Sequence, residues 1–113
     1  MRYLKNVLSP GEIEDLKREF GSYVKITVDL GLEQLVIGCE LHADGEKILL
    51  EKGAIQNDIW GGGINFITKE IDTTAVLNLR PSLDNNSLEI IDPDRRNKFL
   101  SIAKKIFTNL WQI

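Results

Sequence analysis

The residues best suited to chemistry gather in one stretch of this chain, between residues 38 and 63. That stretch holds the only histidine (His42), the only cysteine (Cys39), one of the two tryptophans (Trp60) and the only run of three glycines. An imidazole acts as a general base when a neighbouring group holds it in the right orientation, and a carboxylate can be that group. The candidate catalytic residues are His42, Glu40 and Asp58.

The alternation of apolar and polar residues predicts a strand over residues 35–42, with Glu40 and His42 on its less apolar face. In a regular strand, the odd offset between Cys39 and His42 excludes a nucleophile–base pair. Strands predicted near residue 65 and over 74–80 add polar side chains to the same sheet face. The sequence thus predicts a site for a polar or anionic small ligand. Its candidate residues are Glu40, His42, Asn65, Asn78 and Arg80.

Arg80 suits an anion because a guanidinium can hold a carboxylate or phosphate with two parallel hydrogen bonds. The same residues also fit a solvated sheet face on which Glu40 and Arg80 pair across strands. A metal site of Glu40, His42, Asp44 and Asp58 is a narrower alternative. Asp44 fits better as a helix cap, and one histidine is few for a transition metal. We therefore predict no metal and no cofactor.

Capping signals and apolar spacing predict three helices. These helices are expected at about residues 10–20, 45–52 and 93–111. Ser9 is the expected N-cap of the first helix, within a capping box. Asp44 is the expected N-cap of the second helix, and Asp92 of the third. Apolar residues fill about half the circumference of the third helix, so it should form a wall of the core.

Alternating residues predict the strands, and 23–29 is the clearest of them. The others are expected near 1–7, 35–42, 64–67 and 74–80, with a turn at 69–72. The glycine run at 61–63 is read as a bulge, a bend or a place where another backbone or a ligand approaches closely. The expected fold is α+β, with a mostly antiparallel sheet of four to five strands in a single domain over residues 1–113.

Charge and hydropathy limit the partners. The net charge is −3, and residues 1–92 carry 9 basic against 16 acidic side chains. An acidic body argues against binding to nucleic-acid phosphates. No apolar run approaches the ~20 residues of a membrane span. The single cysteine cannot form an internal disulfide, which favours a reducing compartment, and we expect a cytoplasmic location.

The C-terminal residues Leu110, Trp111 and Ile113 are unusually apolar for a chain terminus. They either pack onto the core or meet a second subunit, so the protein is expected to be a monomer or a homodimer. Three functions stay open. The first is a small binding or accessory protein with the polar sheet-face site. The second is a small hydrolase that uses His42 with Glu40 or Asp58, and the third is an interaction module that dimerises through its last helix.

Three segments resemble a family of short prokaryotic proteins classed as a domain of unknown function. They are residues 40–44 (Glu-Leu-His-Ala-Asp), 58–61 (Asp-Ile-Trp-Gly) and 78–82 (Asn-Leu-Arg-Pro-Ser). The chain departs from the family pattern at Cys39, where a second glycine is usual, and in having three glycines after Trp60, where one is usual. The resemblance covers most of the chain and implies no activity.

Overall fold

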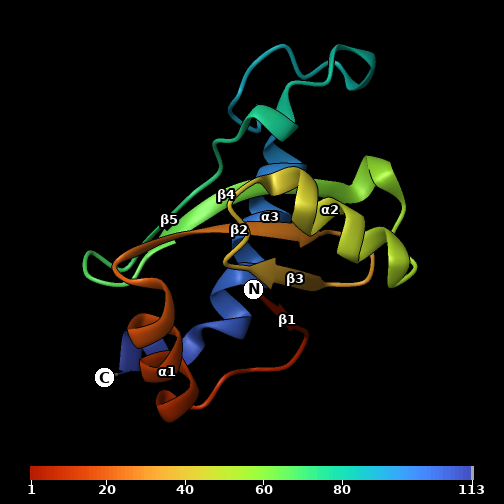
Figure 1. Cartoon of the computed structure of the whole chain (residues 1–113). Helices are drawn as coiled ribbons and strands as arrows, with labels where there is room; N and C mark the ends of the chain where they lie inside the picture. The colour runs from red at the N-terminus through yellow and green to blue at the C-terminus, as the bar shows by residue number, and fades with distance from the viewer. Residues whose placement is uncertain (113) are drawn as a thin grey trace.

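The computed structural model describes residues 1–112 and shows an antiparallel sheet with helices on both faces (Figure 1). The strands are β1 (Arg2–Leu4), β2 (Tyr23–Asp29), β3 (Gln34–Ile37), β4 (Ile59–Asn65) and β5 (Glu70–Asp72). Their order in the sheet is β1-β3-β2-β4-β5, which leaves β1 and β5 at the edges. In this part of the chain the α-helices are α1 (Pro10–Phe20), α2 (His42–Glu51) and α3 (Pro93–Ile106). The predicted α+β class is confirmed, and the sheet has five strands, within the predicted four to five.

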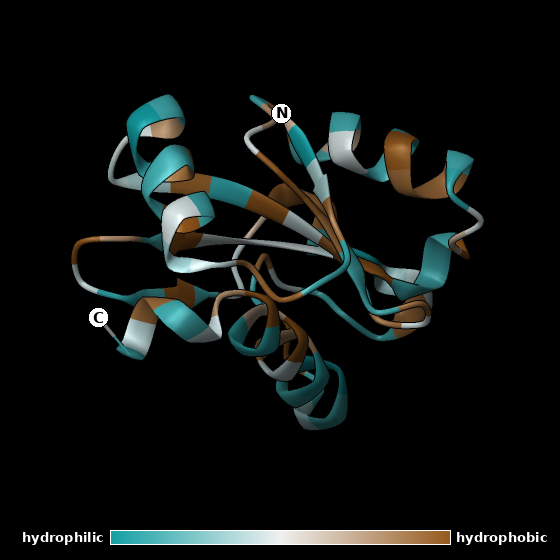
Figure 2. Ribbon diagram, turned by 90° about the horizontal axis from the view of Figure 1, so that it is seen from below, coloured by the Kyte–Doolittle hydropathy of each residue, from teal (hydrophilic) through white to brown (hydrophobic). Residues whose placement is uncertain are grey.

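Two apolar clusters hold these layers together. The larger cluster lies between the sheet and helices α1 and α3, where Val24, Ile26 and Val28 of β2 meet Phe99 of α3. The smaller cluster lies beneath α2 and is centred on Leu49. Figure 2 shows apolar residues concentrated in the strands and recurring along the helices. The sheet is therefore covered on both faces, and α2 covers only part of its face.

Helices α1 and α3 begin where capping chemistry predicts. The Ser9 hydroxyl accepts a hydrogen bond from the Glu12 amide, and the Glu12 carboxylate accepts one from the Ser9 amide. The Asp92 carboxylate accepts from the Arg95 amide at the start of α3. This helix ends at Ile106 rather than near residue 111, and the chain continues as a 3₁₀ helix over Thr108–Gln112.

The C-terminal tail packs onto the molecule. Leu110 is fully buried in the larger cluster, whereas Trp111 is partly exposed. The third apolar residue of the predicted tail, Ile113, lies outside the described residues. The tail thus packs onto the core. The expectation of a monomer or a homodimer stays a prediction.

The predicted strand over 35–42 is wrong beyond Ile37. Gly38 has φ +92°, a left-handed conformation that ends the ladder, and a Cβ there would overlap the Phe20 ring. Helix α2 then begins at His42, three residues earlier than expected. Its N-cap is Leu41, which makes no side-chain capping bond, and Asp44 lies inside the first turn instead of capping it. Glu40 and His42 therefore do not share a strand face.

The glycine run lies in a regular inner strand, β4, rather than in a bulge or bend. Seven residues of β4 pair with β2, from Asp29 opposite Ile59 to Tyr23 opposite Asn65. The predicted close approach is confirmed, because a Cβ on Gly62 would overlap the carbonyl oxygen of Asp72. Glycine is present here because neighbouring groups occupy the space of a side chain.

The predicted strand over 74–80 is also wrong. The strand next to β4 is β5, which lies where a turn was expected, and an irregular segment follows over residues 73–91. In this segment Val76–Asn78 forms a 3₁₀ turn, with Asn78 fully buried and Leu79 half exposed. Alternation misleads here because the hydrogen bonds of buried side-chain amides, rather than a ladder, hold the segment.

We expect Gly62→Ala to destabilise the protein by about 1–3 kcal/mol, because the added methyl group meets a backbone oxygen that cannot rotate away. The control is Gly11→Ala in α1, where the nearest atom to an added Cβ is the Ser9 Oγ at 3.9 Å. That change should stabilise the protein by roughly 0.5 kcal/mol through backbone entropy. Urea unfolding measures both. Equal stabilities for Gly62→Ala and the wild type would contradict the close approach at β4.

Candidate functional site

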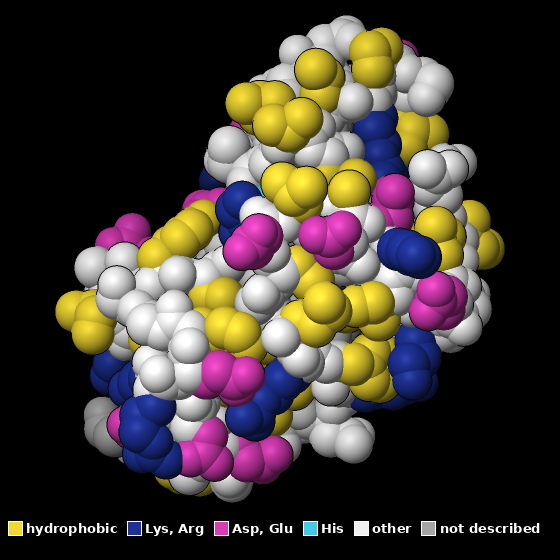
Figure 3. Space-filling model, in the orientation of Figure 1, with side chains coloured by type: hydrophobic (Ala, Val, Ile, Leu, Met, Phe, Trp, Pro, Cys, Tyr) yellow, Lys and Arg dark blue, Asp and Glu magenta, His cyan; other side chains and the backbone are white. Residues whose placement is uncertain are grey.

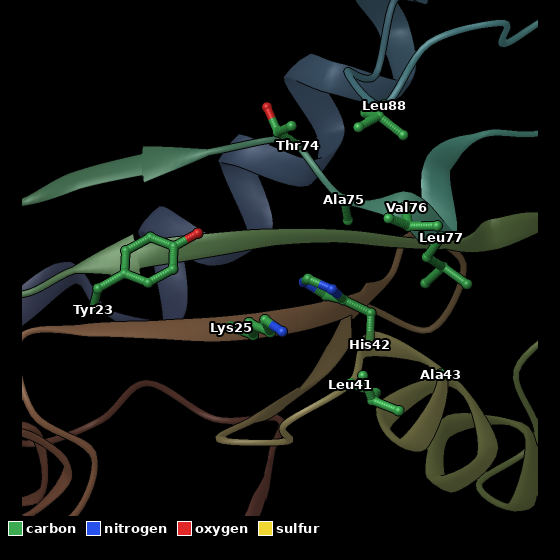
Figure 4. A pocket seen from close by; sticks show the side chains of 10 residues that line it. All are labelled: Tyr23, Lys25, Leu41, His42, Ala43, Thr74, Ala75, Val76, Leu77 and Leu88. Carbon is green, nitrogen blue, oxygen red and sulfur yellow. The ribbon is translucent and has the colours of Figure 1, made fainter.

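A pocket of about 500 Å³ opens on the α2 face of the sheet, between the start of α2 and the segment 73–91. We call it the His42 pocket. Its lining residues are Tyr23, Lys25, Leu41, His42, Ala43, Thr74, Ala75, Val76, Leu77 and Leu88 (Figure 4). Figure 3 shows hydrophobic side chains gathered over this part of the surface. The pocket therefore has an apolar rim around a histidine.

Gly61 and Gly63 of β4 lie beneath side chains that line the pocket. A Cβ on Gly61 would lie 2.8 Å from His42 Cδ2 and 2.7 Å from the Ala75 Cβ. A Cβ on Gly63 would overlap the Tyr23 hydroxyl oxygen. Because these side chains are absent, the rings of His42 and Tyr23 can lie directly over the strand. The pocket lies over the part of β4 that carries no side chains on this face.

The imidazole of His42 is fixed by the sheet. Its Nε2 lies 2.8 Å from the carbonyl oxygen of Gly62, and a carbonyl only accepts, so Nε2 carries the proton. Nδ1 has no hydrogen-bond partner among residues 1–112. Every buried side-chain nitrogen and oxygen in this range does have one, so Nδ1 is not fully buried. The ring of this pocket residue thus keeps one acceptor without a partner in the described chain.

Burial lowers the pKa of His42 from its usual 6.5, because the protonated ring loses hydration. The Gly62 carbonyl opposes this shift by accepting the Nε2 hydrogen, and nearby Lys25 adds to the shift by repulsion. The Asp72 carboxylate opposes it weakly. His42 is therefore a neutral imidazole at neutral pH.

Lys25 brings a positive charge to the pocket. Its Nζ donates to the backbone carbonyl of Glu40 at 2.5 Å, which leaves two of its three hydrogens for other acceptors. Lys25 takes part in none of the ion pairs formed within residues 1–112. Tyr23 donates to the Asp72 carboxylate at 2.7 Å, and burial and this carboxylate raise the pKa of Tyr23 to about 12. Tyr23 is thus a neutral phenol.

Of the candidate residues from the sequence, all within the described range, His42 alone lines the pocket. Glu40 is exposed in the bend before α2 and contributes only its backbone carbonyl. The side-chain oxygen of Asn65 accepts from two amides of the turn after β4. The Asp58 carboxylate lies beside Gly31, in the turn between β2 and β3. The structure does not bring these residues together.

Asn78 and Arg80 have their own partners within the chain. The Asn78 amide is fully buried and bonds both backbone groups of Gly61, at 2.8 and 2.9 Å. Arg80 pairs with Glu46 at 2.9 Å, not with Glu40, and its guanidinium stacks 5.1 Å from the Trp60 ring centre. These contacts make Asn78 and Arg80 part of the scaffold around the pocket.

Sequence reasoning missed Tyr23 and Lys25 as pocket residues. Their alternation in β2 does place them on the polar face of the strand. Their role depends on the register that sets Lys25 opposite Gly63, and no local pattern reveals that register. The glycine run was the available signal, because a strand without side chains leaves room beside a neighbouring polar strand.

Two further features bear on the class of site. Within residues 1–112, no three His, Cys, Asp or Glu side chains are grouped so as to hold a metal ion. None of the helices described is long and apolar enough to cross a membrane.

The fold and site define a small α+β protein with a mixed polar and apolar pocket on one sheet face. Residues 2–106 match the family model described as "Protein of unknown function (DUF5674)", and the chain belongs to this family. The resemblance to an uncharacterised family is confirmed at this level. No curated protein and no solved structure matches the chain. Membership of this family assigns no activity, so the function is inferred from the pocket.

We expect Asn78→Asp to destabilise the protein by about 3 kcal/mol. The change keeps the shape but removes the Nδ2 donor, which serves the carbonyls of Gly61, Thr73 and Leu88. Asn86→Asp is the control, since Asn86 is exposed. Chemical denaturation compares the two variants. A loss in Asn78→Asp no larger than in the control would mean that this amide does not hold the segment 73–91.

The pKa of His42 should lie below 6.5 in the folded protein. NMR titration can measure it without assignment ambiguity, because His42 is the only histidine. On acidification the unfolded chain then takes up the proton first. The stability from neutral His42 is complete above pH 6.5 and is lost as the pH falls through the folded pKa. His42→Gln should lack this part of the pH dependence. A measured pKa above 6.5 would refute the burial argument.

Proposed function

We propose that this protein is a small-molecule binding protein and that the His42 pocket is its binding site. The pocket volume of about 500 Å³ falls in the range of small-ligand sites, roughly 300–1,000 Å³. Such sites combine apolar walls with a few polar groups that fix orientation. The observation that carries the proposal is that His42, Lys25 and several aliphatic side chains line one pocket over the glycines of β4.

Binding has more support than catalysis. A hydrolase with His42 as general base needs a group that orients the imidazole and a group or water that it activates. The Gly62 carbonyl orients the ring, but neither predicted carboxylate contacts it. Among the described residues that line the pocket, Tyr23 and Thr74 carry the hydroxyls, and both already bond carboxylates, of Asp72 and Glu89.

We further propose a cytoplasmic location and no nucleic-acid partner. Cys39 is buried and forms no disulfide, which suits a reducing compartment. The acidic excess of residues 1–92 opposes binding to phosphate backbones.

Filling the pocket tests the proposal. The probes are octanoate, octan-1-ol, octylamine, benzoate, benzyl alcohol and benzylamine, each titrated into isotopically labelled protein and followed by NMR. We expect at least one probe to shift the signals of His42 and Ala43 in a saturable way. Ala43→Phe should weaken that binding at least tenfold, since Ala43 is exposed and lines the pocket without supporting the core.

Ser101→Phe is the matched control, because it adds the same ring to an exposed position of α3, a helix on the other sheet face. It should leave the affinity unchanged. Probes that shift no pocket signal, or that bind Ala43→Phe as well as the wild type, would sink the proposed function.

A further inference from the structure

We propose that the His42 pocket takes an amphipathic carboxylate, a molecule with one carboxylate head and an aliphatic tail. The inference rests on the proposed function and adds the chemical class of the ligand. Three features carry it: the charge of the lining, the separation of polar and apolar walls, and the exposure of the apolar wall.

The charge of the lining favours a single negative charge. None of the described residues that line the pocket carries a carboxylate, and Lys25 is the one among them that is charged at neutral pH. Two carboxylates contact pocket residues, and both already accept hydrogen bonds. Asp72 accepts from the Tyr23 hydroxyl and the Thr74 amide, and Glu89 accepts from the hydroxyls of Thr73 and Thr74. A cationic ligand would therefore find only a like charge, that of Lys25, among the residues that line the pocket. A phosphate monoester, with a charge near −2, would exceed what one ammonium can balance.

The walls separate by polarity. Figure 4 shows Tyr23 and Lys25 toward one end of the pocket, and Val76, Leu77 and Leu88 toward the other. His42 lies between the two ends. A head group held by the two remaining hydrogens of the Lys25 ammonium would direct its tail along the aliphatic wall. This layout fits a molecule that is itself polar at one end.

Several aliphatic side chains that line the pocket are exposed to solvent. Val76 is 76% exposed, Leu41 61% and Leu88 43%, although all three line one pocket. Neighbouring exposed aliphatic side chains commonly mark a binding surface. An aliphatic tail would remove this surface from water, and each buried methylene should tighten binding about fourfold.

The imidazole supplies an independent readout. A carboxylate beside Nδ1 favours the protonated ring, so binding of the anion should raise the pKa of His42 from its lowered value. The other charged groups that act on the ring are Lys25 on β2, which repels the proton, and Asp72 on β5, which favours it. A neutral alcohol in the same place should leave the pKa nearly unchanged.

The experiment compares octanoate, octan-1-ol, octylamine and butanoate by NMR titration, below their micelle concentrations. We expect octanoate to bind at least tenfold more tightly than octan-1-ol and to raise the pKa of His42. Butanoate, four methylenes shorter, should bind roughly 200-fold more weakly than octanoate. Lys25→Met should weaken octanoate about tenfold and leave octan-1-ol unchanged. Lys104→Met, at an exposed position of α3, is the control and should change neither affinity.

The outcomes separate the two proposals. If octan-1-ol or octylamine binds as tightly as octanoate, or if Lys25→Met leaves octanoate binding intact, the carboxylate assignment is wrong while the pocket still binds small molecules. If butanoate matches octanoate, the tail assignment is wrong. If no probe shifts a pocket signal, both this inference and the proposed function fail.

Discussion

One buried side-chain amide completes the sheet where its edge strand stops. Strand β5 pairs with residues 63–65 of β4 and does not reach Gly61. The N–H and C=O of Gly61, which point away from β2, therefore have no strand partner. The Asn78 amide bonds both of them and is fully buried. Buried backbone groups left unpaired would each destabilise the fold by about 1–3 kcal/mol. This contact attaches the segment 73–91, which contributes five pocket residues, to β4.

A second buried amide holds the first. The Nδ2 of Asn85 donates to the carbonyl of Asn78, and its Oδ1 accepts from the Ile91 amide. The same Nδ2 donates to the Ser87 and Glu89 carbonyls. The segment 73–91 thus has a fixed shape without belonging to the sheet, because side-chain amides satisfy the backbone groups that a ladder would otherwise pair. This is why Val76 and Leu88 can stay exposed on a well-defined wall.

The features that the sequence predicted well are those determined by neighbouring residues. The Ser9 capping box and the Asp92 cap start their helices where expected, and the alternation of β2 matches its buried face. The failures share another cause. Gly38, the glycine strand and Asn78 each respond to a partner distant in sequence: the Phe20 ring, the Asp72 carbonyl and Gly61. His42 was found as a rare residue, while its neighbour Lys25 depends on a register that no local pattern encodes.

The three glycines are needed for two different reasons, because successive strand residues face opposite sides of the sheet. Gly62 faces the larger core, where Phe99 and the Asp72 carbonyl fill the space of a side chain. Gly61 and Gly63 face the pocket, where the rings of His42 and Tyr23 fill it. Each glycine weakens a strand by roughly 0.5–1 kcal/mol relative to alanine, which full pairing with β2 and burial of Trp60 and Ile64 can offset. Gly62 is thus required by the fold, whereas Gly61 and Gly63 are required by the rings of His42 and Tyr23, which line the pocket.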